Sequence, residues 1–107
     1  MEKSGILFIC AAGNSGANTD IIPVYPACFD MPNILSVAAV DNNGRLAEFS
    51  NYGSKIHAAA PGVNILTTAP EGSFSFAGGT SMAAPYVTGI AALVKSHAPD
   101  STSTEIA

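Results

Sequence analysis

Ser81 is the side chain in this sequence best placed to act as a nucleophile. It lies in residues 78–85, Gly-Gly-Thr-Ser-Met-Ala-Ala-Pro, after two glycines and before a run of small residues. Glycine lets a second backbone approach closely, and the apolar helical pattern that follows directs the positive end of a helix at the hydroxyl. A serine hydroxyl is a weak nucleophile until a neighbouring base removes its proton. The segment therefore predicts nucleophilic catalysis that depends on further groups.

A helix must position Ser81, and residues 80–96 carry its pattern. Apolar residues recur there at spacings of three and four, at Ala84, Val87, Ile90, Ala91 and Val94. The pattern is apolar almost all round, so we expect this helix to run through a core. Pro85 falls in the second turn, where it deprives the carbonyl of Ser81 of its usual donor. Helix capping by Thr80 is the alternative explanation of the Thr-Ser pair.

A mostly parallel sheet is the expected scaffold for this helix. Three short apolar runs are typical of buried strands, at residues 5–11, 34–40 and 56–60. The first run ends at a Gly-Asn-Ser-Gly turn, residues 13–16. Residues 63–68 and 73–77 flank Ala-Pro-Glu-Gly and predict a hairpin. The expected fold class is α/β, with a mostly parallel sheet, a hairpin and one buried helix.

The segments around the serine and at the end of the first strand resemble one known family. The Gly-x-Ser-x-Gly elbow of α/β-hydrolases is excluded because Ala83 stands where its second glycine is needed. Residues 79–85 instead resemble the serine signature of the subtilisin-like proteases (subtilases, peptidase S8). Further segments resemble that family in its own order, at residues 11–14, 25–27, 33–41, 49–53 and 59–63. Together they cover essentially the whole chain, which resembles the C-terminal portion of a three-layer catalytic domain.

The resemblance implies a role for two polar residues. Ser81 would be the nucleophile, and its own N–H would donate to an oxyanion. Asn14 would add a side-chain amide donor to the same oxygen, without a charge that must be desolvated. On spacing alone, an ordinary turn asparagine in Gly-Asn-Ser-Gly is the favoured interpretation of Asn14. The resemblance also implies a cis peptide bond between Tyr25 and Pro26.

The resemblance further implies which residues contact a peptide or protein substrate. These are Ala11, Ala12, Gly13, Val24, Gly79 and Thr80. Val24 stands at a position where a glycine would make the substrate pocket deeper. We therefore expect a shallower pocket for the residue before the cleaved bond, which favours substrate side chains that are apolar and of medium size. No cofactor is expected in this chain, although the intact parent is compatible with calcium. Asp41 is the cation candidate, and turn chemistry is the alternative for it. Secretion is the location that the resemblance implies.

The base that Ser81 needs is missing from this sequence. The family's histidine and orienting aspartate lie in His-Gly-Thr-like and Asp-Ser/Thr-Gly-like motifs, and neither motif occurs here. The resemblance gives His57 a strand position without a catalytic role. His97 lies about 24 Å from Ser81 along the helix, where it favours the helix C-terminus.

We therefore expect residues 1–107 to be a partial subtilase catalytic domain that lacks its N-terminal portion and is inactive alone. Residues 1–4 resemble the last turn of a helix, and residues 102–105 have the form of a capping box, so both ends are expected to cut an element. Two alternatives stay open. In the first alternative the chain is a non-catalytic remnant or binding module. In the second it belongs to a pseudoprotease whose histidine has been replaced.

The composition agrees with a chain that forms part of the interior of a larger domain. Apolar residues make up 48% and charged residues 11% of a 107-residue chain, although a small body has proportionally more surface to cover. No apolar run reaches the roughly 18–20 residues of a membrane span. Four scattered basic residues and a net charge of −4 argue against nucleic-acid binding. Cys10 and Cys28 do not make a metal site, and a buried free thiol at Cys10 is favoured over a disulfide.

Overall fold

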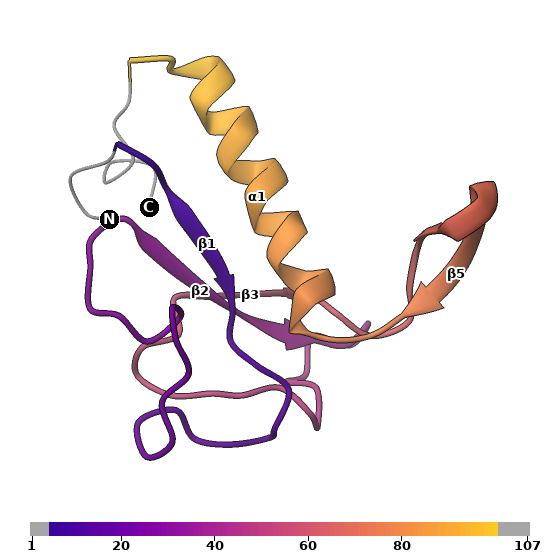
Figure 1. Cartoon of the computed structure of the whole chain (residues 1–107), viewed down its shortest axis with the longest axis horizontal. Coiled ribbons are helices and arrows are strands. Elements are labelled where there is room, and N and C mark those ends of the chain that lie inside the picture. The colour runs from indigo at the N-terminus through magenta and orange to yellow at the C-terminus, as the bar shows by residue number, and fades with distance from the viewer. Residues whose placement is uncertain (1–4, 101–107) are drawn as a thin grey trace.

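The computed structural model describes residues 5–100 as a small parallel sheet with one helix and one hairpin (Figure 1). In chain order the elements are β1 (Phe8–Ala11), β2 (Ile34–Val40), β3 (Ala58–Pro61), β4 (Ile65–Ala69), the 3₁₀ turn η2 (Pro70–Gly72), β5 (Ser73–Ala77) and α1 (Thr80–His97). Strands β1 and β3 both pair in parallel with β2, and β4 pairs with β5 in antiparallel. The predicted α/β class, with a parallel sheet, a hairpin and one helix, is confirmed.

Strands β3 and β4 begin two residues later than the sequence predicts. The amide of Ile56 donates to the carbonyl of Gly53 at 3.2 Å, so Ile56 belongs to a turn and the strand begins after it. Asn64 has a positive φ of 53°, which bends the chain just before β4. Both differences come from local turns that apolar patterning does not register.

Helix α1 and a loop cover opposite faces of the sheet. On one face Val37, Ala39 and Ala60 form a buried cluster with Ala83 of the helix. On the other face Cys10 and Ile34 pack against Ala27, in the loop between β1 and β2. The alternation of side chains along β2 explains this division, since residues of a strand point to opposite faces in turn. The first turn of α1 is thereby fixed against the sheet.

The outer face of α1 differs from the buried helix expected from its sequence. Thr80 and Ala83 are the buried residues of the helix, whereas Ile90 is 60% and Leu93 is 71% exposed. A shallow groove of about 300 Å³ lies between α1 and β1, lined by apolar residues such as Leu7, Ile9 and Ala91. Within residues 5–100 nothing packs over this side of the helix, so its apolar surface faces outward.

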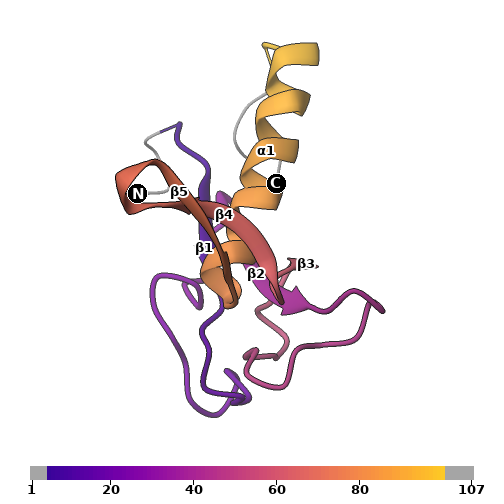
Figure 2. The same ribbon diagram turned by 90° about the vertical axis from the view of Figure 1, so that its right-hand side faces the viewer.

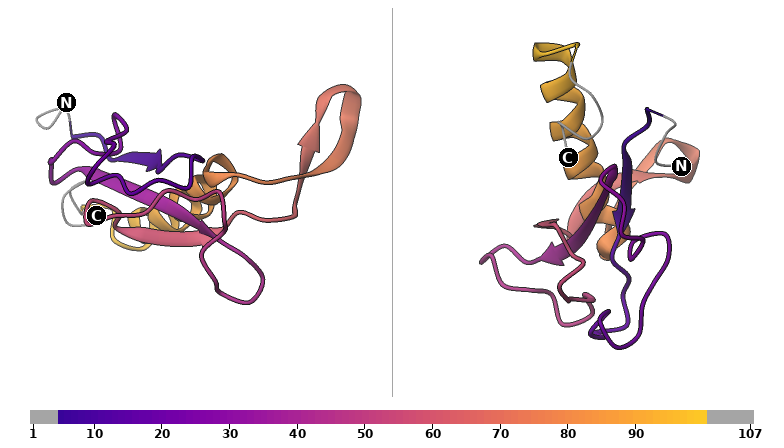
Figure 3. Two further views of the ribbon diagram at one scale, coloured as in Figure 1. Left: turned by 90° about the horizontal axis from the view of Figure 1, so that it is seen from below. Right: turned by 90° about the vertical axis from the view of Figure 1, so that its left-hand side faces the viewer.

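The hairpin of β4 and β5 extends away from the sheet and the helix. It projects from the body in Figure 1 and in the left view of Figure 3, and it faces the viewer in Figure 2. Its larger apolar side chains Leu66, Phe74 and Phe76 are exposed. The hairpin therefore adds a second apolar surface that this part of the chain does not cover.

Three further expectations concern the ends, the membrane and the cysteines. The helix ends expected at residues 1–4 and 102–105 lie outside the described residues. Among residues 5–100, no helix has both the length and the apolar character needed to cross a bilayer. Cys10 and Cys28 are both buried free thiols, and burial raises the pKa of the Cys10 thiol.

Gly62 fixes the contact between the sheet and the start of α1. A methyl group there would lie 2.6 Å from Cβ of Ala39 and 2.8 Å from the carbonyl oxygen of Gly79. We expect Gly62→Ala to lower the free energy of unfolding by about 1–3 kcal/mol through overpacking. Gly89→Ala in the isolated chain is the matched control, because within residues 5–100 open space surrounds that helical glycine. It should raise stability by about 0.5–1 kcal/mol. Urea unfolding of both variants measures the difference, and equal midpoints would contradict it.

Candidate functional site

Ser81 is the exposed second residue of α1. The N-cap residue is Gly79, whose φ of 141° lies in a region that side-chain-bearing residues rarely adopt. At this position the backbone N–H of Ser81 has no acceptor within the helix. Pro85 lies inside the helix, as predicted, and it removes the donor for the carbonyl of Ser81. The first turn thus presents a free hydroxyl beside a free N–H.

Thr80 joins the start of the helix to the end of β1. Its side chain is fully buried, and it is not the N-cap, so the capping alternative does not describe its contacts. The Thr80 hydroxyl donates to Oδ1 of Asn14 at 2.9 Å, and the Thr80 N–H donates to the same oxygen at 2.8 Å. The hydroxyl oxygen also accepts the N–H of Gly13 at 3.1 Å. These bonds bring together two segments that are 66 positions apart.

The side chain of Asn14 and the backbone nitrogen of Ser81 both lie close to Gly79. With Oδ1 of Asn14 engaged by Thr80, the Nδ2 group is left as the donor end of the amide. A methyl group on Gly79 would lie 3.6 Å from Nδ2 of Asn14, and 3.8 Å from both Oδ1 of Asn14 and N of Ser81. The absence of a side chain at Gly79 therefore leaves room for an acceptor near both donors. The arrangement suits an oxygen that gains negative charge.

The structure also brings several predicted substrate-contact residues together. Ala12 is buried and its N–H donates to the carbonyl of Val37 at 2.9 Å, which continues the sheet ladder. Gly13 follows with a φ of 107°. Val24 lies next to it, since a methyl group on Gly13 would be 3.6 Å from Cγ2 of Val24. Ala11 is half-buried at the end of β1. The substrate role of these residues stays a prediction.

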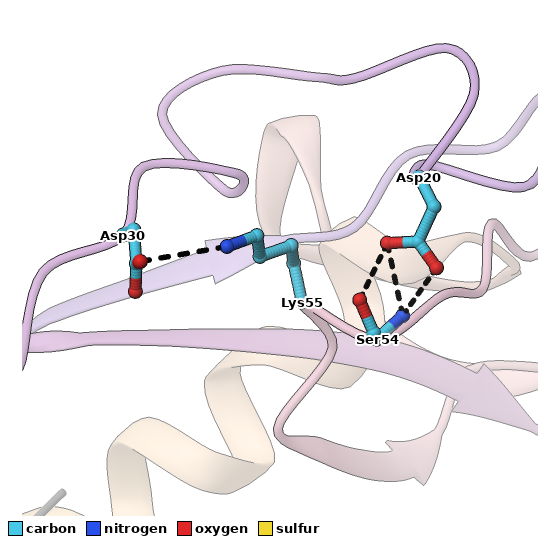
Figure 4. A network of polar contacts seen from close by, with 4 residues as sticks. All are labelled: Asp20, Asp30, Ser54 and Lys55. Atoms are coloured by element: carbon cyan, nitrogen blue, oxygen red, sulfur yellow. Dashed lines mark hydrogen bonds and ion pairs between the residues drawn. The ribbon is translucent and has the colours of Figure 1, made fainter.

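The loop that carries Val24 is tied to a second loop by two polar contacts (Figure 4). The carboxylate of Asp20 accepts the hydroxyl of Ser54 at 2.6 Å and its N–H at 3.0 Å. Lys55 lies 3.6 Å from Asp30. The hydrogen bonds from Ser54 lower the pKa of Asp20. The carboxylate of Asp20 accepts these hydrogen bonds in its charged form, so both are present at neutral pH. They weaken as the pH falls through the lowered pKa of Asp20.

The remaining predicted positions have ordinary structural contacts. The peptide bond between Tyr25 and Pro26 is cis, as predicted. Oδ1 of Asp41 accepts the N–H of Asn43 at 2.9 Å and of Arg45 at 3.0 Å, which is turn chemistry. Among residues 5–100 no three His, Cys, Asp or Glu side chains gather as a metal site would require.

The two histidines lie away from Ser81 in the fold. Nδ1 of His57 accepts the N–H of Ser36 at 3.0 Å, on the approach to β3. His97 is the last residue of α1, near the helix C-terminus as expected. Neither of these side chains belongs to the site around Asn14.

Comparison with known proteins identifies the family. The family model described as the subtilase family, peptidase S8, matches residues 1–107. The chain belongs to the subtilase family. It is 47% identical over 97 residues to Subtilisin-like protease 2 of Plasmodium falciparum, covering 90% of this chain and 7% of that protein. It is 46% identical over 105 residues to Thermostable alkaline protease of Halalkalibacterium halodurans, covering 98% of this chain and 28% of that protein.

Solved subtilase structures share the fold as well. A cold-adapted subtilisin-like serine proteinase superposes with a TM-score of 0.88 and 34% identity, covering 97% of this chain and 37% of that one. The chain therefore spans about a third or less of the length of these subtilases. Their family is one of serine proteases, and the shared fold includes the sheet, the hairpin and the helix described above.

Asn51 is a site residue to which the sequence analysis gave no role. It belongs to residues 49–53, which resemble the family without any catalytic assignment. Its side chain is buried, and it bonds the backbone on both sides of Asn14. The sequence contains no signal for this role, because a Ser-Asn-Tyr-Gly segment is typical of a turn and the bonding partners of Asn51 are distant in the chain.

Proposed function

We propose that this chain supplies the nucleophile and the oxyanion hole of a subtilisin-type serine endopeptidase. The observation that carries the proposal is that N of Ser81 and Nδ2 of Asn14 both lie close to Gly79, while Oδ1 of Asn14 is occupied by Thr80. The Ser81 hydroxyl is exposed at the same helix start. Acyl transfer needs a nucleophile and oxyanion donors in this relation.

The reaction would proceed in two steps. Oγ of Ser81 attacks the carbonyl carbon of a peptide bond while its proton passes to a histidine, and the carbonyl oxygen becomes an oxyanion held by the two donors. The C–N bond then breaks, the amine leaves with that proton, and an acyl-enzyme remains. A water molecule then attacks the acyl carbon while the histidine takes one of its protons. The bond from that carbon to Oγ of Ser81 breaks, the acid is released, and the histidine gives the proton taken from water to Oγ of Ser81.

The histidine and its orienting aspartate would come from the same protein outside residues 1–107. Nδ1 of His57 is bonded to Ser36, and His97 lies about 24 Å from Ser81 along α1, so neither reaches the hydroxyl. The chain spans 28% of one bacterial relative and 37% of one solved structure. We therefore interpret it as a partial catalytic domain whose N-terminal portion carries the base.

The exposed apolar surfaces support this interpretation. Strand β1 is an edge of the sheet as described, and the groove beside it is lined by apolar side chains. Exposed contiguous apolar area in a soluble protein marks an interface. The N-terminal portion of the same domain is the partner that fits, because an unpaired parallel strand and an apolar helix face both require a covering layer.

The substrate would be a peptide or protein. Val24 narrows the space beside Gly13, which favours medium apolar side chains before the cleaved bond. Secretion follows from the family resemblance and forms part of the proposal. Calcium in the intact protein is proposed on the same ground.

Residues 1–107 expressed alone should show no protease activity. Without a base the Ser81 hydroxyl keeps its proton, so a fluorophosphonate probe should leave Ser81 unlabelled over hours. The matched control is the full-length protein that contains this chain, in which the probe should label Ser81 rapidly and stoichiometrically. Mass spectrometry of the labelled peptide measures both.

Rapid labelling of the isolated chain would contradict the assignment of the base to another segment. A full-length sequence that lacks the aspartate and histidine motifs would contradict the proposed activity and favour a non-catalytic remnant.

A further inference from the structure

The buried side chain of Asn51 binds the backbone of the segment that carries Asn14. Its Oδ1 accepts the N–H of Ser15 at 3.1 Å and that of Ala17 at 3.0 Å. Its Nδ2 donates to the carbonyl of Ala12 at 2.9 Å. The Asn51 backbone N–H also donates to the carbonyl of Gly13 at 2.9 Å. Four bonds from one residue thus attach residues 12–17 to the loop after β2.

These bonds lie on both sides of Asn14 and leave its own side chain free to contact Thr80. Asn51 is 1% exposed, so its hydrogen bonds are shielded from bulk water. Both ends of the Asn51 amide are used, since Oδ1 accepts two hydrogen bonds and Nδ2 donates one. A side chain at this position must therefore combine an acceptor and a donor, as an amide does. Gly13 packs directly on it, because a methyl group there would lie 2.4 Å from Nδ2 of Asn51.

The segment needs such support because it leaves the sheet at this point. Strand β1 ends at Ala11, and Gly13 turns the chain with a positive φ. Beyond Ala12 the ladder to β2 no longer fixes the backbone. Thr80 binds the segment from the helix side, and Asn51 binds it from the opposite loop.

We propose that Asn51 is a positioning residue for the oxyanion hole. It holds residues 12–17 so that Nδ2 of Asn14 points to the space beside Gly79. This inference rests on the proposed function, since it concerns the same reaction. Misplacement of a catalytic donor by about 1 Å is enough to cost on the order of 10²-fold in rate.

A double-mutant cycle in the full-length protein tests the proposal. Asn51→Ala should lower kcat by about 10–100-fold with little change in KM, because the oxyanion forms only after binding. Asn14→Ala removes the donor itself. If Asn51 acts through Asn14, adding Asn51→Ala to the Asn14→Ala variant should lower kcat by less than about 3-fold. Losses that multiply in the double variant would overturn the proposal.

Asn33→Ala is the matched control. Asn33 is also a fully buried asparagine, and its Nδ2 donates to the carbonyl of Ile6 at 2.9 Å, before the start of β1. It should lower the melting temperature to a similar extent as Asn51→Ala and leave kcat unchanged. An equal loss of kcat in both variants would show a general effect of destabilisation and overturn the proposal. If Asn51→Ala does not fold, Asn51→Ser takes its place in the cycle, because it removes the amide and introduces no buried charge.

Failure of the proposed function is recognised separately. In that case the wild-type full-length protein neither cleaves peptides nor labels at Ser81. Amide hydrogen exchange in the same protein then decides the role of Asn51. Loss of protection at Ser15 and Ala17 in Asn51→Ala would support positioning of the segment if protection is retained at His57, whose N–H donates to the carbonyl of Ser36 at 2.9 Å. Unchanged protection at Ser15 and Ala17 would overturn it.

Discussion

Ser81→Ala in the full-length protein should lower kcat for a peptide amide by about 10⁶-fold. The magnitude is taken from removal of the nucleophile in subtilisin, a member of the same family. The physical reason is that no second hydroxyl replaces Oγ of Ser81 at the start of α1, where the neighbouring Thr80 hydroxyl is buried and bonded to Asn14. KM should change little, because the hydroxyl contributes mainly to the chemical step. Hydrolysis of a chromogenic peptide amide at several substrate concentrations measures both constants.

Two controls make this result specific. Ser96→Ala removes an exposed hydroxyl near the far end of the same helix, about 22 Å away along its axis, and should leave kcat unchanged. The Ser81→Ala protein should still bind substrate and retain about 10³–10⁴-fold catalysis over the uncatalysed reaction, because the oxyanion donors remain. Activity within tenfold of the wild type in Ser81→Ala would place the nucleophile elsewhere.

The order of the elements and the motif positions were predictable because they depend on local signals. The run at residues 34–40 coincides with β2, and the Ala-Pro-Glu-Gly turn joins β4 to β5 as expected. The helix begins at Thr80, where the glycines end. Turn chemistry and apolar periodicity act over a few residues, so a single sequence contains them.

Long-range contacts account for what the sequence did not predict. Asn51 looks like a turn residue by itself, and its partners, Ala12 to Ala17, lie 34 to 39 positions away. Thr80 has the residue type of an N-cap, yet its hydroxyl binds Asn14. The helix was expected to be buried because its residues are apolar on all sides, but burial also requires a neighbour. Within residues 5–100 that neighbour is absent from the outer face, where Leu93 is exposed.

Asn14→Ala should lower kcat by about 10²–10³-fold in the full-length protein. This magnitude comes from the loss of an oxyanion-hole donor in subtilisin. The variant removes two things, however. It deletes the Nδ2 donor, and it deletes the Oδ1 acceptor that binds the N–H and hydroxyl of Thr80. A loss of activity in Asn14→Ala alone therefore does not say which end of the amide matters.

Asn14→Asp separates the two ends of the side chain. A carboxylate keeps the acceptor for both groups of Thr80, so the helix start stays attached to the end of β1. It replaces the donor with a negative oxygen, which repels the developing oxyanion. We therefore expect Asn14→Asp to lose at least as much kcat as Asn14→Ala while melting at or above the temperature of that variant. Asn18→Asp is the control, because the bond that its Oδ1 accepts within residues 5–100 comes from the N–H of Asp20 in the same loop, and it should leave kcat unchanged. If Asn14→Asp kept the wild-type kcat, the donor role of Nδ2 would be wrong and the contribution of Asn14 would be its contact with Thr80.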